Sequence, residues 1–489
     1  MTIHLSIVLF LPLAAGLAGV VLPRGLARWA ALAGSVAVLS YVVVMLVDFE
    51  TGGGLQWVTD DEWISELGVR YTLGIDGLNL WLVGLTTLLF AAAALWVFVR
   101  PVERPRLFTF HLGLAETAVL GAFLAQDLAL FVLFFDLMLV PFYFLVGQWG
   151  AGPDRVAATY KLIIYTLVGS LLMLAGAVAT AVLSADGGSI TFVLSDLAKA
   201  TLGESTQRWI FVTFALAFLI KMPLFPFHGW MPDAYRTMPL PALAVFSGVL
   251  SKVAAYGFLR IVLPLFPAAA KDFQTLILVL ALLSIVYGSV LAFTQTNARL
   301  VLGYSSVAQL GFIVLGVFAL DPEGRGAQGA ILQMVNHGLV VAPLFLVIAV
   351  LAERAGGSED IREMGGLAFR GPVLAALFLV AALATLAMPG SANFAGEFLI
   401  LLGLFNTKLA MAIIAFTGVA LASVYMLRMF IRAMHNRSGP TTISRELTLG
   451  DAIVIVPLIL AIIAFALYPQ GALSDSEPVV KATIEEVVR

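Results

Sequence analysis

The sequence contains no cysteine and only five histidines in 489 residues. The absence of cysteine excludes disulfides, thiolate-bound zinc, cysteine-ligated iron–sulfur clusters and cysteine nucleophiles. The glycine-rich motifs G-x-G-x-x-G and G-x-x-x-x-G-K-[ST], which form dinucleotide and phosphate sites, are also absent from the sequence. We therefore expect no nucleotide or flavin fold, and we expect any coupled redox chemistry to lie on a partner.

Charged residues are scarce, at 12% of the chain, whereas soluble domains carry about 25%. Hydrophobic residues make up 61%, and many apolar runs reach about 20 residues, which is long enough to cross a bilayer. The net charge of −3 provides no basic field for nucleic acid. Composition therefore predicts an all-α polytopic membrane protein.

Apolar windows between charged or Gly/Pro-rich breaks predict fourteen transmembrane spans. The first window lacks a preceding cation and a small-residue cleavage site, so we expect a retained helix instead of a signal peptide. The spans lie near 3–22, 28–47, 76–99, 107–125, 128–148, 157–183, 209–230, 240–264, 273–295, 298–319, 327–352, 372–401, 407–434 and 449–469.

The distribution of charge over the loops predicts the orientation of the chain. If the first loop, "PRGLAR", is cytoplasmic, most of the 27 lysines and arginines fall on that side. This agrees with the positive-inside rule and places both termini outside. The acidic segments "DFETGGGLQWVTDDEWISELG" and "DSEPVVKATIEEVVR" then fall on the outer side. We expect a multi-pass protein of a bacterial cytoplasmic membrane with both termini on the outer side.

Ionisable residues occur deep inside five separate spans. A charge at mid-membrane costs roughly 2.5–3.5 kcal/mol on insertion scales and usually faces a partner or a wet cavity. Each one could be a structural pair between helices, but acids, lysines and a histidine together are typical of a proton relay. The secondary candidates are Glu116, which lies shallower, His228, which lies among prolines at a helix break, and Gln309. The deep residues are Asp136, Lys221, Lys252, His337 and Glu397.

Proline interrupts two spans beside a deep charge. Pro223 and Pro226 follow Lys221 in the seventh span, and Pro389 precedes Glu397 in the twelfth. Paired broken helices are a sequence sign of a transporter's ion site. Because the two breaks lie five spans apart, spans 4–8 and 9–13 are predicted to form inverted five-helix repeats. The predicted units are 1–106 (spans 1–3 with an acidic outer loop), 107–264, 273–434, and 449–489 (the last span and an outer tail).

Several motifs resemble one known family. "KMPLFPFHGWMPDA", "SGVLSKVAAYGFLR", "NARLVLGYSSVAQLGF" and "MPGSANFAGEFLI" are similar to the antiporter-like membrane subunits of respiratory complex I and to Mrp-type cation/proton antiporter subunits. "LGIDGLNLWLV", "DLALFVLFFDLMLVPFYFLVGQWG" and "REMGGL" most resemble the M, or subunit-4, type. The resemblance covers most of the chain.

The resemblance implies roles for the matching residues. Lys221 is similar to the broken-helix lysine that cycles a proton, and Asp136 stands where the family has its acidic partner, normally Glu. Lys252 and His337 match connecting relay residues, and Glu397 matches the outlet residue. The chain departs from the family pattern in three places: Asp136 is one methylene shorter than Glu, Gln309 replaces a common histidine, and "DAYRTMPLPALAVFSG" is divergent.

The resemblance also implies a function and partners. The expected function is that of a proton-translocating membrane subunit of NADH:quinone oxidoreductase, a translocase without a redox centre in this chain. NADH, FMN, iron–sulfur clusters and quinone are expected on partner subunits, and L- and N-type subunits are expected as neighbours, with lipid around the spans. Two alternatives stay open: a subunit of a sodium/proton antiporter or related hydrogenase or ferredoxin complex, and a scaffold whose buried charges only pair helices.

Overall fold

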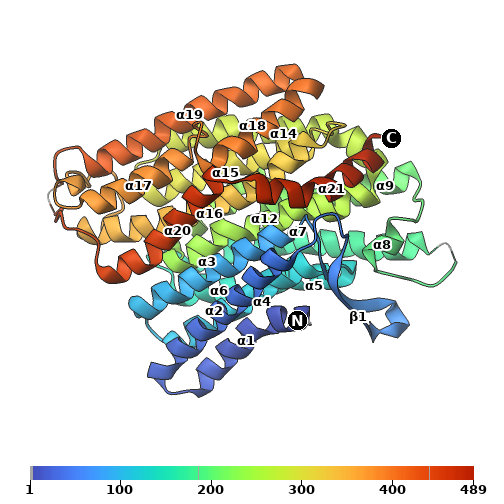
Figure 1. The fold of residues 1–489 in the computed structure, drawn as a ribbon, viewed down its shortest axis with the longest axis horizontal. Helices are drawn as coiled ribbons and strands as arrows, with labels where there is room; N and C mark the ends of the chain where they lie inside the picture. Colours follow the sequence, from blue (N-terminus) through green and yellow to red (C-terminus); the bar gives the residue numbers. More distant parts are fainter. Residues whose placement is uncertain (1–3, 186, 440) are drawn as a thin grey trace.

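The computed structural model describes residues 4–185, 187–439 and 441–489. The chain folds into a helical bundle that follows the sequence from α1 and α2 at one edge to α18 and α19 at the other (Figure 1). The first helices are α1 (Leu5–Val21), α2 (Arg24–Asp48), α3 (Leu80–Val99), α4 (Pro105–Leu124), α5 (Leu128–Leu137), α6 (Leu139–Trp149), α7 (Arg155–Ser184), α8 (Leu194–Leu197), α9 (Glu204–Lys221) and α10 (Met231–Thr237).

The second half of the chain continues the bundle. Its helices are α11 (Leu240–Val245), α12 (Ser251–Gly257), α13 (Leu263–Leu265), α14 (Pro267–Thr294), α15 (Ala298–Val317), α16 (Arg325–Arg354), α17 (Pro372–Ala384), α18 (Ala392–Thr407), α19 (Leu409–Met434), α20 (Leu449–Leu467) and α21 (Gln470–Val488). Short 3₁₀ turns are η1 (Ser65–Leu67), η2 (Phe227–Trp230) and η5 (Leu367–Phe369), and π-helical turns are η3 (Phe246–Leu250) and η4 (Phe258–Val262).

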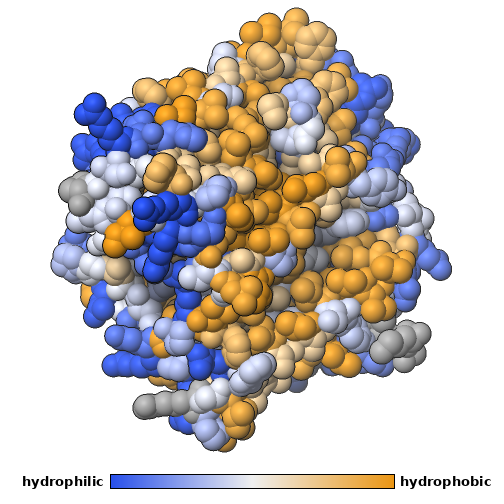
Figure 2. Space-filling view, turned by 60° about the vertical axis from the view of Figure 1, so that its left-hand side comes forward, coloured by the Kyte–Doolittle hydropathy of each residue, from blue (hydrophilic) through white to orange (hydrophobic). Residues whose placement is uncertain are grey.

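Eleven helices of the described chain are long and apolar enough to cross a membrane. Three shorter apolar helices are α1, α17 and α18, and the last two form one interrupted span. The polytopic helical fold predicted from the sequence is confirmed, whereas the count of fourteen spans stays a prediction. Figure 2 shows the expected surface, an apolar band between two hydrophilic zones.

Burial divides the spans into a centre and a periphery. The most apolar windows of α15 and of the span from Leu240 to Leu265 are completely buried, and that of α16 is 94% buried. In contrast, the windows of α2, α19 and α20 are only 33% buried. The central helices carry Lys252, Gln309 and His337, so these polar side chains are surrounded by protein instead of lipid.

The acidic segment between the second and third spans contains the strands of the described chain. β1 (Gln56–Ile64) pairs with β2 (Val69–Ile75) in an antiparallel hairpin, with Thr59 opposite Leu73. The start of β2 joins the bundle because Asp127, at the start of α5, accepts a hydrogen bond from the Arg70 N–H at 3.0 Å. The sequence analysis assigned no secondary structure to this segment.

The carboxyl-terminal segment, predicted only as an outer tail, is helix α21. Asp475 joins α21 to the third span and to its preceding loop. One carboxylate oxygen accepts from Trp81 Nε1 at 3.0 Å, and the other accepts from Thr51 Oγ1 at 2.5 Å. At its far end, Lys271 Nζ donates to the Val488 carbonyl. α21 therefore ties the end of the chain to both halves of the bundle.

Candidate functional site

The seventh span breaks directly after Lys221, as predicted. α9 ends at this residue, because Pro223 and Pro226 have no N–H to donate and clash with a preceding helical turn. The span resumes as η2 and α10. The Ile220 carbonyl at the end of α9 accepts a hydrogen bond from Trp230 Nε1 at 3.0 Å. A side chain from the second half of the span therefore satisfies a carbonyl that the break would otherwise leave free.

Lys221 is held by the fifth span. Its Nζ donates to the Phe135 carbonyl at 3.3 Å and lies 4.5 Å from the centre of the Phe135 ring. Asp136 is the next residue, at the end of α5, where the span is interrupted at Met138 before α6. In the described part of the chain, no ion pair joins Asp136 to Lys221, and Asp136 Oδ1 is buried without a hydrogen-bond partner. The two charges are near neighbours that do not touch.

Lys252 lies in the eighth span, directly after the π-helical turn η3. A π turn widens the helix and disturbs the usual pattern of carbonyl partners, and such turns often occur at functional sites. Here the Ser247 carbonyl accepts a hydrogen bond from Lys252 Nζ at 2.6 Å. The Ser247 hydroxyl lies 3.3 Å from that of Ser306 on α15. Lys252 itself is completely buried.

Gly338 lets the helix that carries His337 approach the turn before Lys252. A Cβ placed on Gly338 of α16 would lie 2.6 Å from the Gly248 carbonyl oxygen, so only glycine permits this approach of α16 to η3. His337 precedes Gly338, is buried, and lies within the electrostatic influence of Lys252. His337 Nδ1 has no hydrogen-bond partner in the described structure.

Glu397 is surrounded by amide side chains. Its Oε1 accepts from Gln309 Nε2 at 2.9 Å and, at a longer 3.4 Å, from Gln333 Nε2. Gln333 Nε2 also donates to Gln309 Oε1 at 2.7 Å. Glu397 Oε2 is buried and has no partner among the described residues. Gln309 thus links α15 to the acid of α18.

The twelfth span breaks between α17 and α18, as Pro389 predicts. Ala387 and Gly390 there adopt positive φ angles of 47° and 87°. The break borders a cavity of about 180 Å³, one wall of which is formed by α20. Ser391 lies at its edge with a buried hydroxyl that has no partner in the described chain. Glu397 therefore lies in the second half of its broken helix, more than one turn after the break.

The five deep residues form a connected row. A small cavity beside Lys221 has Phe246 and Leu250 of η3 in its wall, so the seventh span meets the turn that precedes Lys252. Lys252 neighbours His337, and Gln333, one helical turn before His337, reaches Glu397. The row passes through spans 5, 7, 8, 11 and 12 in that order.

Two of the secondary candidates, Glu116 and His228, lie away from this row. Glu116 on α4 is completely buried and accepts from Ser35 Oγ of α2 at 2.9 Å, while its Oε1 has no partner in the described residues. His228 in η2 packs between aromatic rings, and its Nε2 lies 3.2 Å from the Tyr287 hydroxyl. The structure therefore connects His228 to α14 and Glu116 to the amino-terminal helices.

Three polar residues near Glu397 were not identified from the sequence. Gln333 and Asn336 lie on α16, and Asn393 lies on α18; all three are completely buried. Asn336 Nδ2 donates to the Ala392 carbonyl at 2.6 Å, and both polar atoms of Asn393 lack partners among the described residues. A signal was present, because Gln333, Asn336 and His337 recur at helical spacing in an apolar span.

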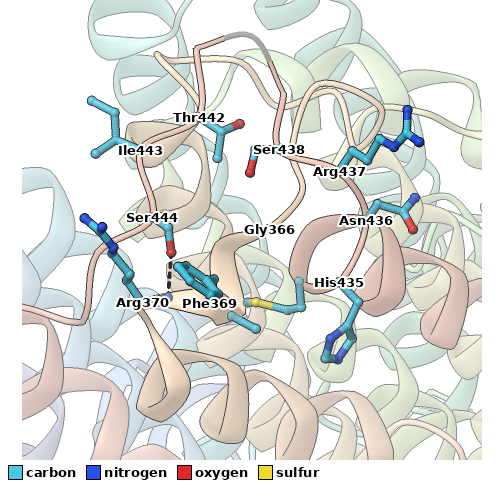
Figure 3. Close-up of a pocket in the computed structure, with 12 residues that line it drawn as sticks. Gly366, Phe369, Arg370, His435, Asn436, Arg437, Ser438, Thr442, Ile443 and Ser444 are labelled. Carbon is cyan, nitrogen blue, oxygen red and sulfur yellow. Dashed lines mark hydrogen bonds between the residues drawn. The ribbon is translucent and has the colours of Figure 1, made fainter.

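The larger cavity shown in Figure 3 is separate from the row. It has a volume of about 760 Å³ and is lined by loop residues, among them Arg370, Arg437 and Ser444. The Ser444 hydroxyl accepts a hydrogen bond from the Arg370 N–H at 2.9 Å. No group of three or more histidines and carboxylates suited to a metal ion occurs in the residues that the structure describes.

Discontinuous helices with buried ionisable residues on separate spans define an ion-transporting membrane protein. The family described as "NADH:quinone oxidoreductase/Mrp antiporter, TM" matches residues 125–448. NADH-quinone oxidoreductase subunit M of Rhodobacter capsulatus is 34% identical over 486 residues, covering 95% of this chain and 93% of that protein. The chain belongs to this family, and the resemblance found in its motifs is confirmed.

Two solved structures show the same fold. A chain of respiratory complex I from Thermus thermophilus with bound NADH superposes with a TM-score of 0.91 at 30% identity, over 99% of this chain and 100% of that one. A chain of the Mrp complex from Dietzia sp. superposes with a TM-score of 0.85 at 22% identity, over the whole of both chains. The second likeness concerns the fold alone.

Proposed function

We propose that this chain translocates protons as the M-type membrane subunit of an NADH:quinone oxidoreductase. The observation that carries the proposal is the series of ionisable residues inside five spans, linked by the Phe135 carbonyl, a small cavity beside Lys221, the electrostatic influence of Lys252 on His337, and Gln333. The family relationship supports the same function, since the relatives are named for this enzyme. In this proposal the chain moves protons while electron transfer takes place elsewhere.

The row suggests an order of proton transfer. A proton on Lys221 passes to Lys252 and His337, and then through the amide cluster to Glu397 and outwards. Asp136 attracts the charged form of Lys221 without contacting it, so a small movement of the interrupted fifth span changes their interaction. A change in partner subunits can drive transfer only by favouring one of these two arrangements over the other.

The remaining parts of the proposal concern the assembly. NADH, FMN, iron–sulfur clusters and quinone bind to partner subunits, and L- and N-type subunits flank this chain. Both termini, the β1–β2 hairpin and α21 lie on the outer side of a bacterial cytoplasmic membrane. The repeats 107–264 and 273–434 act as two inverted half-channels, with Lys221 and Glu397 at their broken helices.

Replacing Lys221 with methionine tests the proposal. Methionine keeps an unbranched chain and removes the charge, so we expect assembly to survive because no ion pair is broken. Proton-to-electron stoichiometry, measured on the native complex in membrane vesicles, is expected to fall. The matched control is Lys199→Met, which removes an exposed lysine of the loop after α8. An unchanged stoichiometry in Lys221→Met would remove this residue from the mechanism.

A subunit of a sodium/proton antiporter is the second candidate, favoured by the likeness of fold to the Mrp complex. The proton chemistry of the row would be the same, and the driving force would differ. Purification of the native complex distinguishes the two: redox subunits support the oxidoreductase, and small antiporter subunits support the antiporter.

A further inference from the structure

A solvent-open cavity of about 440 Å³ lies at the amino-terminal end of α7. Its walls are the turn from Ala151 to Asp154, the first turns of α7, and α10. An ion pair crosses it, with Lys161 Nζ of α7 at 2.7 Å from Asp233 Oδ2 of α10. Both side chains are partly exposed, at 42% and 44%. The cavity is on the side of the chain that is rich in cations.

The small cavity beside Lys221 lies next to this one along α7 and the segment from η2 to α10, and the two cavities share no lining residue. On α7, the open cavity ends at Lys161 and the small one begins at Leu162, extending to Thr166. On the other wall, Asp233 lines the open cavity and Trp230 the small one. Lys161 and Thr166 are separated by a rise of about 7.5 Å along a helix. The small cavity has a volume of about 10 Å³, close to the room one water molecule needs.

Buried hydroxyl groups extend the path along α7. Thr159, Thr166 and Ser170 are buried and recur at spacings of seven and four residues, which places them on one face of the helix. Thr166 lines the cavity of Lys221, and Ser170 lies beside Asp136. Thr166 and Ser170 therefore lead from the small cavity to the first members of the charged row, whereas Lys161 lies on another face of α7, about 140° around the helix from Thr166.

We propose that Lys161 and Asp233 form the proton-uptake mouth of the relay, a site that rests on the function proposed above. The Asp233 carboxylate takes one proton from water, which opens its ion pair with Lys161. The same proton then passes through water at Thr166 to the Lys221 amine, and the carboxylate pairs again with Lys161. One proton enters and one is delivered, so charge and atoms balance.

The charged and titratable groups around Asp233 come from four elements. They are Asp154 before α7, Lys161 on α7, Arg236 on α10, Tyr304 on α15, and Arg299 of α15 with its partner Glu359. Lys161 holds the carboxylate through the ion pair, Arg236 adds a second cation to the cavity wall, and Asp154 adds a second acid at the opening.

The first test is the pH profile of pumping. In inverted vesicles the medium faces the cation-rich side, so its pH sets the supply of protons. Asp233→Asn is expected to slow pumping about ten-fold at alkaline pH, the lower end of the range for lost electrostatic steering, and to approach the native rate at acidic pH. Asp233→Glu is expected to restore the native profile. A native profile, or an equal loss at every pH, would overturn the proposal.

Two controls separate uptake from stability. Asp196→Asn removes the acid of the exposed Lys199–Asp196 pair, whose atoms are 3.0 Å apart, and is expected to keep the native profile. The double variant Lys161→Met, Asp233→Asn removes both charges, so neither side chain is left charged without its partner. An exposed ion pair contributes only about 0–1 kcal/mol to the stability of a protein. It is expected to assemble and still show the alkaline loss. A native profile in the double variant would overturn the assignment.

The second test uses the absence of cysteine in the chain. Thr166→Cys is expected to react with a small charged thiol reagent added from the cation-rich side. The matched control is Thr180→Cys, a buried position of the same helix beyond the path, and is expected not to react. No reaction at position 166, or equal reaction at both positions, would contradict the proposed path.

Lys221→Met distinguishes this inference from the proposed function. If Lys221→Met keeps the native stoichiometry, the relay itself is wrong. If Lys221→Met stops pumping and Asp233→Asn keeps the native pH profile, only the uptake mouth is wrong.

Discussion

The seventh and twelfth spans both break at a Met-Pro sequence, yet they hold their charged residues differently. Lys221 ends the first half of its span, and its Nζ is held by a carbonyl and an aromatic ring. Glu397 lies inside the second half of its span, and amide side chains donate to it. The cation is therefore bound weakly at a helix end, whereas the anion is bound inside a polar cluster. The lysine is held by contacts from the fifth span alone, and the glutamate by amide side chains of two other helices.

Neutralising Glu397 is expected to have the largest effect on proton pumping. Glu397→Gln keeps the shape of the side chain and removes the only carboxylate of the amide cluster, so the row loses its last titratable member. We expect proton pumping in vesicles to fall by at least about ten-fold, within the range for removal of a positioned acid–base group. Glu323→Gln, at an exposed acid of a loop, is the control. Retained pumping in Glu397→Gln would break the comparison between the two spans.

Removing a hydrogen-bond donor beside each helix break is expected to have an intermediate effect on stability. The loss of stability is expected to differ between the two breaks. Gln309→Leu leaves a buried carboxylate with one long hydrogen bond, at a cost of about 1–3 kcal/mol. Trp230→Phe at the other break removes a neutral hydrogen bond to Ile220, at about 0.5–1.5 kcal/mol. Thermal inactivation of the complex is expected at a lower temperature for Gln309→Leu than for Trp230→Phe. The reverse order would show that the first break is the more tightly held.

The smallest effect is expected outside the membrane, at the Asp60–Arg70 pair of the hairpin. The Arg70 guanidinium, 2.8 Å away, lowers the pKa of Asp60 below its ordinary 3.8, against a smaller effect of burial. Because the pKa of Asp60 is lower in the folded hairpin than in the unfolded chain, the ion pair stabilises the hairpin at pH values above the ordinary pKa. This stabilisation is lost as the pH falls through the pKa of the folded state. Amide hydrogen exchange of residues 56–75 is expected to accelerate below about pH 4. Asp60→Asn is expected to remove that pH dependence, and its persistence would assign the effect to another group.

Much of the site could be predicted from single residues, because charge in an apolar span is costly and proline breaks a helix wherever it occurs. This is why Lys221, Lys252, His337 and Glu397 could be identified before the fold was known. The partners could not be predicted in the same way. Phe135 holds Lys221 through its backbone carbonyl, which any residue possesses. The π turn before Lys252 has no counterpart in the spacing of apolar residues along the span.

The hairpin and α21 show the same limit outside the spans. The segment from Gln56 to Ile75 belongs to an acid-rich stretch between two spans, so it was expected to be an outer loop. It forms strands because Asp127 and the third span give its second strand a fixed end. The helix α21 similarly lies against residues more than two hundred positions away, such as Trp81 and Lys271.

The sequence by itself determined that the chain spans a membrane, where the helices break, and which ionisable residues lie inside. These properties follow from the local cost of burying charge and of interrupting backbone hydrogen bonds. The tertiary structure decided which of these residues are neighbours: that Asp136 stops short of Lys221, that Gly338 lets the helix of His337 approach the turn before Lys252, and that Gln309 and Gln333 hold Glu397. Such distances depend on how helices pack against each other, which no single span specifies.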